Sequence, residues 1–563
     1  MVPRPVSDAA TIQRNAAIAA ERAGRTDEAA TLFQRATAAH PHDAALLNSA
    51  GSFHARQRDH AAALTYFDHA LERLPAYGEA IVNRAITLSA LGRASEALAA
   101  LRSNQAHLSD DARYWSARAG IERELRYLSA AAHSYERCIA IEPNHRRALH
   151  GRARMALERG EADMVARYRR VLATETTDAE AWLGLAQAME IEGDLEGARA
   201  VAQTLVQQMP GWVAALELLA QQRWSAGDRT GFCDHYAEAS RRQPDEPEIF
   251  RSWCRMLAGV DRFDQAADIA AMARARFPKL EDLALIEAAR AGEAGDDMRA
   301  ERIFAALDLN TDERRLYEAR HLLRRHDPKR AAALLEGVLA NQPDSIGTWA
   351  LLDIAWRLVD DPRHHWLHGQ TGLVSIQSLE LVDEEYSQLV TLLQSLHAKS
   401  SWPIGQSVRD GTQTRGGLFD RTEQEIQNLI GSIERAVERH RRSMPDFDDA
   451  HPVLRHRDAP FRVAGSWSIR LTGAGKHTEH IHPQGIFSSA AHLIVPPAAE
   501  SGEMAGALEL GRSPPDLRLD LPPIATVLPR VGHCILFPST LYHGTRPFDG
   551  GERLSVAFDI APD

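Results

Sequence analysis

Cysteine is scarce in this sequence, which has four among 563 residues (Cys138, Cys233, Cys254 and Cys534) and no C-x-x-C pair. A disulfide framework is therefore not expected, and the spacing favours a reducing compartment. No stretch approaches the roughly 18 consecutive apolar residues of a membrane-spanning helix. The first residues, MVPRPVSDAATIQRNAAIAAERAG, lack the unbroken apolar segment of a signal peptide. We therefore expect a cytoplasmic protein that is not bound to a membrane.

An excess of positive charge is also missing. The chain has 65 basic and 77 acidic residues, a formal net charge of −12, and non-specific binding to nucleic acid needs a basic surface. Nucleic acid is therefore not an expected partner. The apolar content of 44% and the charged content of 25% are ordinary for a soluble globular protein, and the length suggests two to four domains.

Prolines recur at regular intervals in the first 345 residues. Their separations are 34 residues or close to twice 34, and each follows an Ala-rich amphipathic segment that the proline would end: Pro41, Pro75, Pro143, Pro210, Pro244, Pro278 and Pro343. A fixed period of this size indicates a helical solenoid, the alternative being an irregular helical bundle.

The segment that starts at Asp43 resembles a tetratricopeptide repeat (TPR). It has small residues, one aromatic residue and a final proline at the spacings of that family: Gly51, Ala63, Phe67, Ala70 and Pro75. The small residues would let two antiparallel helices approach, and Phe67 would fill the gap between repeats. About ten repeats, some degenerate, fit an all-α solenoid domain over residues 8–360. The resemblance implies a groove that binds a protein or a peptide.

The pattern changes after residue 360. Residues 421–444 have the apolar stripe of a helix, and six short strands with turn residues between them follow: SWSIRL, FSSAAHLIV, GALEL, ATVLP, HCILFP and RLSVAFDI. These strands predict a β-rich sandwich or jelly roll over residues 370–563, and an α+β multidomain chain as a whole. The polar, Gly-rich stretch Gln406–Gly417 fits a surface loop or a substrate-facing flap equally well.

Three histidines fall within the stretch GKHTEHIHPQG, residues 475–485. On a strand, residues two apart share one face, so His480 and His482 would lie on one face and His477 and Glu479 on the other. Either pair could contribute to a metal site, because two histidines and one carboxylate are the usual ligands of non-haem iron. The residues of this stretch alone leave both pairs open.

A second group of polar residues lies further along the chain. His543 follows His482 by 61 residues, and Arg553 and Ser555 follow His543 by 10 and 12 residues. On the last predicted strand Arg553 and Ser555 share one face, and the alternating apolar residues take the other: Leu554, Val556, Phe558 and Ile560.

Together these pieces resemble an iron(II)/2-oxoglutarate oxygenase, and residues 403–560 are similar to bacterial 2OG-Fe(II) oxygenases with N-terminal tetratricopeptide repeats. The resemblance implies a double-stranded β-helix (jelly-roll) domain and a dioxygenase that hydroxylates a C–H bond with O2. It places Fe(II) on His480, His482 and His543, with His482 where a carboxylate is usual. It places the distal carboxylate of 2-oxoglutarate on Arg553, with Ser555 adding a hydrogen bond. The substrate would be a protein or peptide held by the solenoid.

Other readings of these residues stay open. The metal could lie on His477, Glu479 and His543, or on two histidines with water in the carboxylate's place, as in the aspartyl/asparaginyl β-hydroxylases. In the preferred set, His477 and Glu479 would support the ligands from behind, and His492 could line the cosubstrate pocket or merely pack. A cupin-like metal protein shares the H-x-H pattern, and a TPR scaffold with a degenerate oxygenase domain would need no metal.

Overall fold

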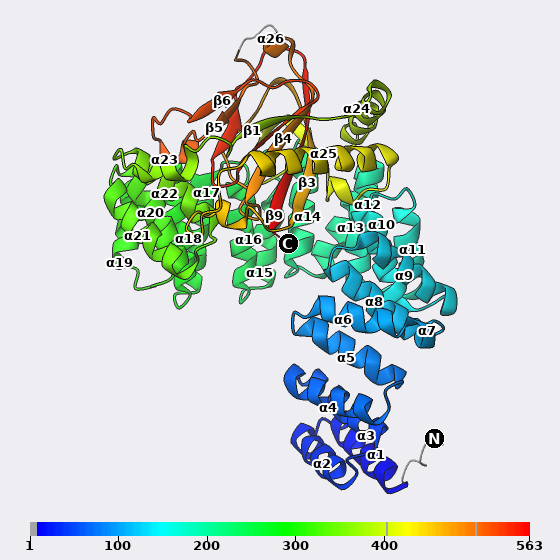
Figure 1. The fold of residues 1–563 in the computed structure, drawn as a ribbon. Helices are drawn as coiled ribbons and strands as arrows, with labels where there is room; N and C mark the ends of the chain where they lie inside the picture. The colour runs from blue at the N-terminus through cyan, green and yellow to red at the C-terminus, as the bar shows by residue number, and fades with distance from the viewer. Residues whose placement is uncertain (1–7, 401–402, 501–503, 563) are drawn as a thin grey trace. The chain divides into compact units, whose positions relative to one another are not determined.

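The computed structural model describes residues 8–400, 403–500 and 504–562 (Figure 1). Parts of the predicted N-terminal segment and of the predicted 370–563 domain lie outside these ranges. The chain divides into two compact units, Met1–Gly184 and Leu185–Asp563, and each is described by itself. The second unit contains the later helices together with the β-rich region. The predicted border between a solenoid domain and a β-rich domain, between residues 360 and 370, therefore stays a prediction.

The first unit is entirely helical over its described residues. Its helices are α1 (Asp8–Arg22), α2 (Thr26–Ala39), α3 (Ala44–Arg56), α4 (His60–Arg73), α5 (Gly78–Ala90), α6 (Ala94–Ser103), α7 (Gln105–Leu108), α8 (Ala112–Glu124), α9 (Leu128–Ile141), α10 (Arg146–Glu158) and α11 (Met164–Thr174). The next helix, α12 (Ala179–Glu192), crosses the border between the units.

The same succession of helices continues in the second unit. It comprises α13 (Leu195–Gln208), α14 (Val213–Ser225), α15 (Asp234–Arg242), α16 (Pro247–Ala258), α17 (Phe263–Arg276), α18 (Glu281–Ala294), α19 (Asp297–Ala306), α20 (Asp312–Arg324), α21 (Pro328–Asn341), α22 (Ile346–Arg357) and α23 (Arg363–His368). Short turns join each helix to the next, as the predicted solenoid requires.

The periodic prolines and small residues act as predicted. Each of the seven prolines stands two residues after the last residue of a helix, as Pro41 does after α2 and Pro75 after α4. Gly51 of α3 faces Phe67 of α4, and a β-carbon on Gly51 would lie 2.7 Å from the Phe67 ring. Gly151 meets the ring of Tyr135 in the same way. The missing side chain therefore lets neighbouring helices approach an aromatic ring closely.

The β-rich region forms two antiparallel sheets (Figure 1). The larger sheet has the order β1-β7-β4-β9-β3-β2, and its strands are β1 (Ser375–Ser378), β2 (Val408–Gln413), β3 (Phe461–His477), β4 (Phe487–Ile494), β7 (His533–Pro538) and β9 (Glu552–Pro562). The smaller sheet has the order β6-β5-β8, from β5 (Leu508–Leu510), β6 (Ala525–Val527) and β8 (His543–Thr545).

Two apolar layers hold this region together. Helices α24 (Asp383–His397) and α25 (Gln424–Ser443) cover one face of the larger sheet, and the alternating apolar residues of β9 are buried against them. The other face meets the smaller sheet, where Leu508 and Leu510 pack with Ile535 and Phe537. The remaining short elements are η1 (Leu418–Asp420), η2 (Leu454–His456), α26 (Pro497–Glu500) and η3 (Pro515–Leu517).

All six predicted strands are present, with ends that differ by a few residues, and the predicted helix over residues 421–444 is α25. The sequence pattern missed β1, β2 and β8. These strands are short or polar, and β2 (VRDGTQ) contains no alternation of apolar residues. Among the residues that the structure describes, no helix combines the length and the apolar character needed to cross a membrane.

Three buried histidines make the stability of the fold depend on pH. Burial lowers the pKa of His397, His440 and His451 to about 4. His451 shows why the neutral form is favoured: its Nδ1 accepts hydrogen bonds from the amides of Val453 and Leu454 and therefore carries no proton.

We expect the free energy of unfolding to fall as the pH drops from about 6.5 to about 4, because the unfolded chain then binds protons that the folded chain excludes. Each histidine contributes up to about 3 kcal/mol. Urea unfolding at several pH values measures this slope. His440→Leu should flatten it, whereas His42→Gln, at an exposed position, should not. An unchanged slope in His440→Leu would contradict the assignment.

Candidate metal centre

His480 and His543 are held opposite each other by the backbone. The His480 amide donates to the His543 carbonyl over 3.0 Å, and the His543 amide donates back to His480 over 2.9 Å. This isolated bridge joins the stretch GKHTEHIHPQG to β8. Strand β3 ends at His477, so a single regular strand does not run through the stretch. The prediction that His477 and His480 point to opposite faces is wrong, since both rings reach the Ser407 hydroxyl.

The side chains of His480, His482 and His543 converge. One nitrogen from each of the three lies within 4.8 Å of the others. The ring centroids are 4.2 Å apart for His480 and His543, 4.8 Å for His482 and His543, and 4.9 Å for His480 and His482. The structure therefore brings together the three histidines that the sequence resemblance proposed as ligands.

Hydrogen bonds at Nδ1 set the tautomer of each ring. The Nδ1 of His480 lies 2.8 Å from the carbonyl oxygen of Thr478, and the Nδ1 of His543 lies 3.1 Å from that of Leu541. A carbonyl only accepts, so both nitrogens carry their proton. The Nδ1 of His482 lies 2.7 Å from a carboxylate oxygen of Asp559. Each Nε2 is thus left with its lone pair, the form that binds a metal.

One contact between these rings fits a metal ion. The Nε2 atoms of His480 and His482 are 3.0 Å apart, and two nitrogens that each carry only a lone pair cannot hydrogen-bond to one another. Two nitrogen ligands at about 2.1 Å from a metal, at right angles to each other, lie about 3.0 Å apart. The donor set and its spacing therefore suit a cation between the rings.

Burial keeps the rings of His480 and His543 neutral. Burial, followed by the neighbouring His482, lowers the pKa of His480 to about 3. Burial also lowers the pKa of His543 well below its usual value, with His480 and His482 adding to the effect. A neutral imidazole is the metal-binding form, so the surroundings favour coordination at ordinary pH.

The rival carboxylate set is placed differently. Among the described residues, the group that could hold a metal contains His480, His482 and His543 but neither His477 nor Glu479. A carboxylate oxygen of Glu479 lies 4.0 Å from the guanidinium of Arg512. His477 is half-buried, and its Nδ1 contacts the Ser407 hydroxyl at 3.0 Å.

Arg553 is a buried cation without an ionic partner in the described residues. It is 2% exposed, and its Nη1 donates to the carbonyl oxygen of Gly506 over 2.7 Å. Its Nε is buried and has no hydrogen-bond partner among the residues that the structure describes. Burial lowers the pKa of Arg553 to about 10. An arginine in this state suits an anion that brings two oxygens to the guanidinium.

Two further predicted residues lie beside Arg553. Ser555 is on the same face of β9, two residues along, and is opposite His492 of β4 in the register. His492 is fully buried, and within the described ranges neither of its ring nitrogens has a hydrogen-bond partner. Burial, with Arg553 adding to it, holds the pKa of His492 well below its usual value. Unsatisfied buried donors and acceptors at this point indicate a place for a polar ligand.

The sequence reasoning assigned no role to Asp559, Ser488 or Ser407. Asp559 shares the inner face of β9 with Arg553, and this parity was the signal that could have revealed it. Its carboxylate accepts from the Ser488 hydroxyl over 3.0 Å while holding His482. The Ser407 hydroxyl lies 3.2 Å from the Nε2 of His480.

The Gln406–Gly417 stretch packs against helices of the solenoid. It contains the edge strand β2, and Arg409 forms a bidentate pair with Asp261, which follows α16. Arg415 pairs with Glu190 of α12. Through Ser407 the stretch also reaches the histidine cluster.

Comparison with protein families matches two kinds of region. Residues 465–559 match a model described as "Putative 2OG-Fe(II) oxygenase". Residues 14–78 and 165–211 match one tetratricopeptide repeat model, and residues 54–121 match another. The N-terminal part of the chain is therefore an extensive TPR solenoid, followed by an oxygenase-like β region. The comparison with curated proteins finds no match.

Among solved structures, the chain is similar to helical repeat proteins. The type IV pilus biogenesis factor PilW is 16% identical over 36% of this chain and 96% of its own, with a TM-score of 0.35. A tetratricopeptide repeat protein from Parabacteroides merdae is also 16% identical, over 44% of this chain and 98% of its own, with a TM-score of 0.35. Yeast Tom70 is 13% identical over 63% and 96%, with a TM-score of 0.31.

Proposed function

We propose that this protein is an Fe(II)/2-oxoglutarate-dependent dioxygenase that hydroxylates a protein or peptide recruited by its TPR solenoid. The observation that carries the proposal is the combination of three converging imidazoles with a buried arginine that has no ionic partner among the described residues, on the strand that also holds Asp559. A cupin-like metal protein would account for the histidines but leaves Arg553 without a purpose. A scaffold with a degenerate domain would account for neither.

The strand order supports a double-stranded β-helix, or jelly roll. The central strands of the larger sheet run β3-β9-β4-β7, and the bridge at His480 extends the smaller sheet beside β8. From β3 to β9 the chain passes between the two sheets several times. In this part of the chain the larger sheet contributes β3, β4, β7 and β9, and the smaller sheet contributes β5, β6, β8 and the bridge at His480. In this arrangement His543 comes from the smaller sheet, His480 is bridged to it, His482 follows in the adjoining loop, and Arg553 comes from the larger sheet.

In the proposed reaction the protein would hold Fe(II) through the Nε2 atoms of His480, His482 and His543. When bound, Fe(II) and 2-oxoglutarate supply the oxidative chemistry that inserts oxygen from O2 into a C–H bond. Asp559 would orient His482 and place a negative charge one residue behind the metal. Acting through the imidazole of His482, this negative charge would partly replace the charge of the carboxylate that the ligand set lacks.

Arg553 would bind the distal carboxylate of 2-oxoglutarate through its guanidinium. Ser555 and neutral His492 would add hydrogen bonds to the same carboxylate. The apolar cluster of Leu508, Ile535 and Phe537 between the sheets, in which Phe537 contacts the ring of His543, would help to exclude water from the metal centre. His477 and Glu479 would support the ligand segment from outside the metal set.

Partner binding is proposed for the first unit, at the face formed by the first helix of each repeat. In the second unit the corresponding face already contacts the β region. Gln221 of α14 accepts a hydrogen bond from the amide of Ile404, and Arg357 of α22 donates to the carbonyl of Pro522. In the first unit this face has a cavity of about 580 Å³. Its polar lining includes Asn48, Ser52, Arg56, Glu79, Asn83 and Arg113. An extended polypeptide with hydrogen-bonding groups would fit such a lining. The cytoplasmic location expected from the composition fits this partner class.

The test of the proposed function is turnover of 2-oxoglutarate. We expect the purified chain, loaded anaerobically with Fe(II) and then exposed to O2, to form succinate and CO2 from 2-oxoglutarate, slowly in the absence of a substrate. His480→Ala should form none above the rate of free iron. A wild-type chain that takes up Fe(II) but neither binds nor consumes 2-oxoglutarate would favour a different metal protein. A chain that takes up no Fe(II) would favour the scaffold.

A further inference from the structure

The two segments that carry the candidate ligands both rest on the last helices of the solenoid. His480 and His482 point inward, and Ile481 between them packs on an apolar cluster formed by α20, α21 and α22. Tyr542, which precedes His543, is 7% exposed and belongs to the same cluster. A β-carbon on Gly347 of α22 would lie 3.6 Å from Cδ1 of Ile481. The back of each ligand segment is therefore covered by the solenoid.

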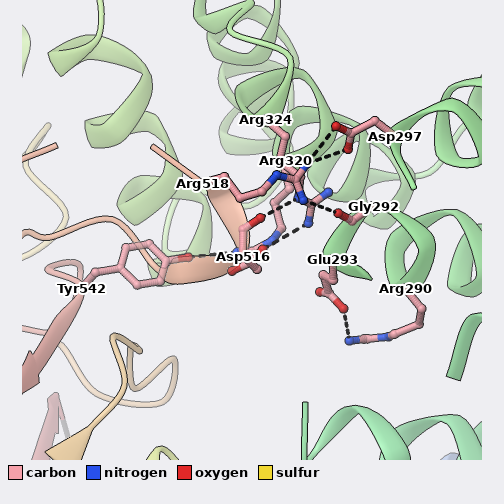
Figure 2. A network of polar contacts seen from close by, with 9 residues as sticks. All are labelled: Arg290, Gly292, Glu293, Asp297, Arg320, Arg324, Asp516, Arg518 and Tyr542. Atoms are coloured by element: carbon pink, nitrogen blue, oxygen red, sulfur yellow. Dashed lines mark hydrogen bonds and ion pairs between the residues drawn. The ribbon is translucent and has the colours of Figure 1, made fainter. Parts of the chain in front are cut away.

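A polar network fixes Tyr542 from the same side. The Nη1 of Arg320, on α20, donates to the Tyr542 hydroxyl over 3.1 Å. The Nη2 of Arg320 donates to both oxygens of Asp516, over 2.7 and 2.6 Å, and Arg324 donates to the Asp516 carbonyl over 3.0 Å (Figure 2). Burial alone would raise the pKa of Asp516, but the two arginines outweigh it and hold the pKa below its usual value. The carboxylate is therefore ionised and locks Arg320 against the tyrosine.

A third contact holds the turn between β7 and β8. His368 of α23 is buried between Asp353 of α22, at 3.0 Å, and the hydroxyl of Thr540, at 2.8 Å. Thr540 and Tyr542 flank Leu541, whose carbonyl oxygen contacts the Nδ1 of His543. The solenoid thus contacts this turn at Thr540 and at Tyr542, on either side of the Leu541 carbonyl that orients His543.

We propose that the last solenoid repeats are a structural part of the metal centre, with Ile481, Tyr542, Arg320 and His368 acting as positioning residues for His480 and His543. The inference rests on the proposed metal site. It gives the solenoid a second role besides partner binding: its final helices set the spacing of the ligand nitrogens, which a flexibly tethered recruitment arm could not do. Rigid packing behind a ligand segment fixes its geometry as an outer-shell hydrogen bond does.

The test uses the full chain and two independent measurements. The first is hydrogen exchange in the metal-free protein at the amides of His480 and His543, which bond to one another. The second is the affinity for Mn(II) alone, measured by titration calorimetry. Ile481→Ala and Arg320→Met should each speed the exchange at least about tenfold and weaken Mn(II) binding about tenfold, within the range known for residues that orient ligands. Tyr542→Phe, which removes one hydroxyl, should show a smaller change in the same direction and keeps the test valid if a larger substitution unfolds the chain.

The control is Arg518→Ala. Arg518 joins η3 to the solenoid through a bidentate pair with Asp297 and a bond to the Gly292 carbonyl, but it contacts neither ligand segment (Figure 2). It should alter neither measurement. If Ile481→Ala, Arg320→Met and Tyr542→Phe only lower overall stability, as Arg518→Ala would, and leave local exchange and Mn(II) affinity unchanged, the positioning role is refuted. A wild-type chain that binds no Mn(II) would instead refute the proposed metal site, while the exchange result would still test the positioning.

Discussion

Arg553→Met should weaken the binding of 2-oxoglutarate to the metal-loaded protein by about 100-fold or more. A carboxylate that meets a buried guanidinium in two hydrogen bonds gains about 3–5 kcal/mol over an unpaired buried charge, which corresponds to such a factor. Among the described residues Arg553 donates to one carbonyl oxygen and its buried Nε has no partner, so most of its hydrogen-bonding capacity is available to the ligand.

The same substitution should not destabilise the ligand-free fold. An unpaired buried cation costs free energy, and methionine fills much of the same volume without the charge. We expect the free energy of unfolding of Arg553→Met to be unchanged or higher by about 1 kcal/mol. Arg553→Lys keeps the positive charge but loses the planar guanidinium. Its affinity for 2-oxoglutarate should therefore fall between those of the wild type and Arg553→Met.

Titration of 2-oxoglutarate into the Mn(II)-loaded protein under anaerobic conditions measures these affinities. Arg546→Met is the matched control, because Arg546 is close in sequence but 40% exposed at its side chain and paired with Glu509. Its affinity for 2-oxoglutarate should equal that of the wild type. Equal affinity in Arg553→Met would remove the cosubstrate site from this strand.

His480→Ala and His543→Ala should each abolish tight Fe(II) binding, with a loss of about 100-fold or more. Even the loss of a residue that only orients a ligand costs about 10–100-fold, and a missing ligand costs more. The effect should be specific to the metal, because each ring is already neutral and its removal leaves no unpaired charge. Anaerobic Fe(II) titration measures the change.

Four variants separate the ligand sets that the sequence left open. With Fe(II) on all three histidines, His482→Ala should match His480→Ala, whereas His477→Ala and Glu479→Gln should bind Fe(II) within a few fold of the wild type. A two-histidine site completed by water would leave His482→Ala close to the wild type. A large loss in Glu479→Gln, with little change in His480→Ala and His482→Ala, would favour the carboxylate set instead.

Periodic features of the sequence predicted the architecture well. The prolines and the small residue at Gly51 specify helix ends and helix contacts locally, so the solenoid could be read without any tertiary information. The apolar residues that alternate from Leu554 to Ile560 in the sequence all pack into one core cluster in the structure. Such patterns depend on one helix or strand at a time, so they can be recognised in the sequence without knowledge of contacts between distant segments.

The site was harder to predict because it depends on contacts between distant segments. The parity argument for His477 and His480 failed where β3 ends, since a bridge to His543, rather than a continuing strand, sets the direction of His480. Asp559 was visible as a residue of β9, but its bond to His482 joins positions 77 apart. The support of Ile481 and Tyr542 by α20 and α22 has no local signal at all, because the partners lie on helices more than 100 residues earlier.

A crystal structure of the full chain with Mn(II) and 2-oxoglutarate, with the metal located by anomalous scattering, tests the central claim most directly. We expect one strong peak at about 2.1 Å from the Nε2 atoms of His480, His482 and His543. We also expect the distal carboxylate of 2-oxoglutarate within hydrogen-bond distance of Arg553. A metal peak on Glu479 and His477, no peak at all, or a 2-oxoglutarate carboxylate away from Arg553 would contradict the assignment.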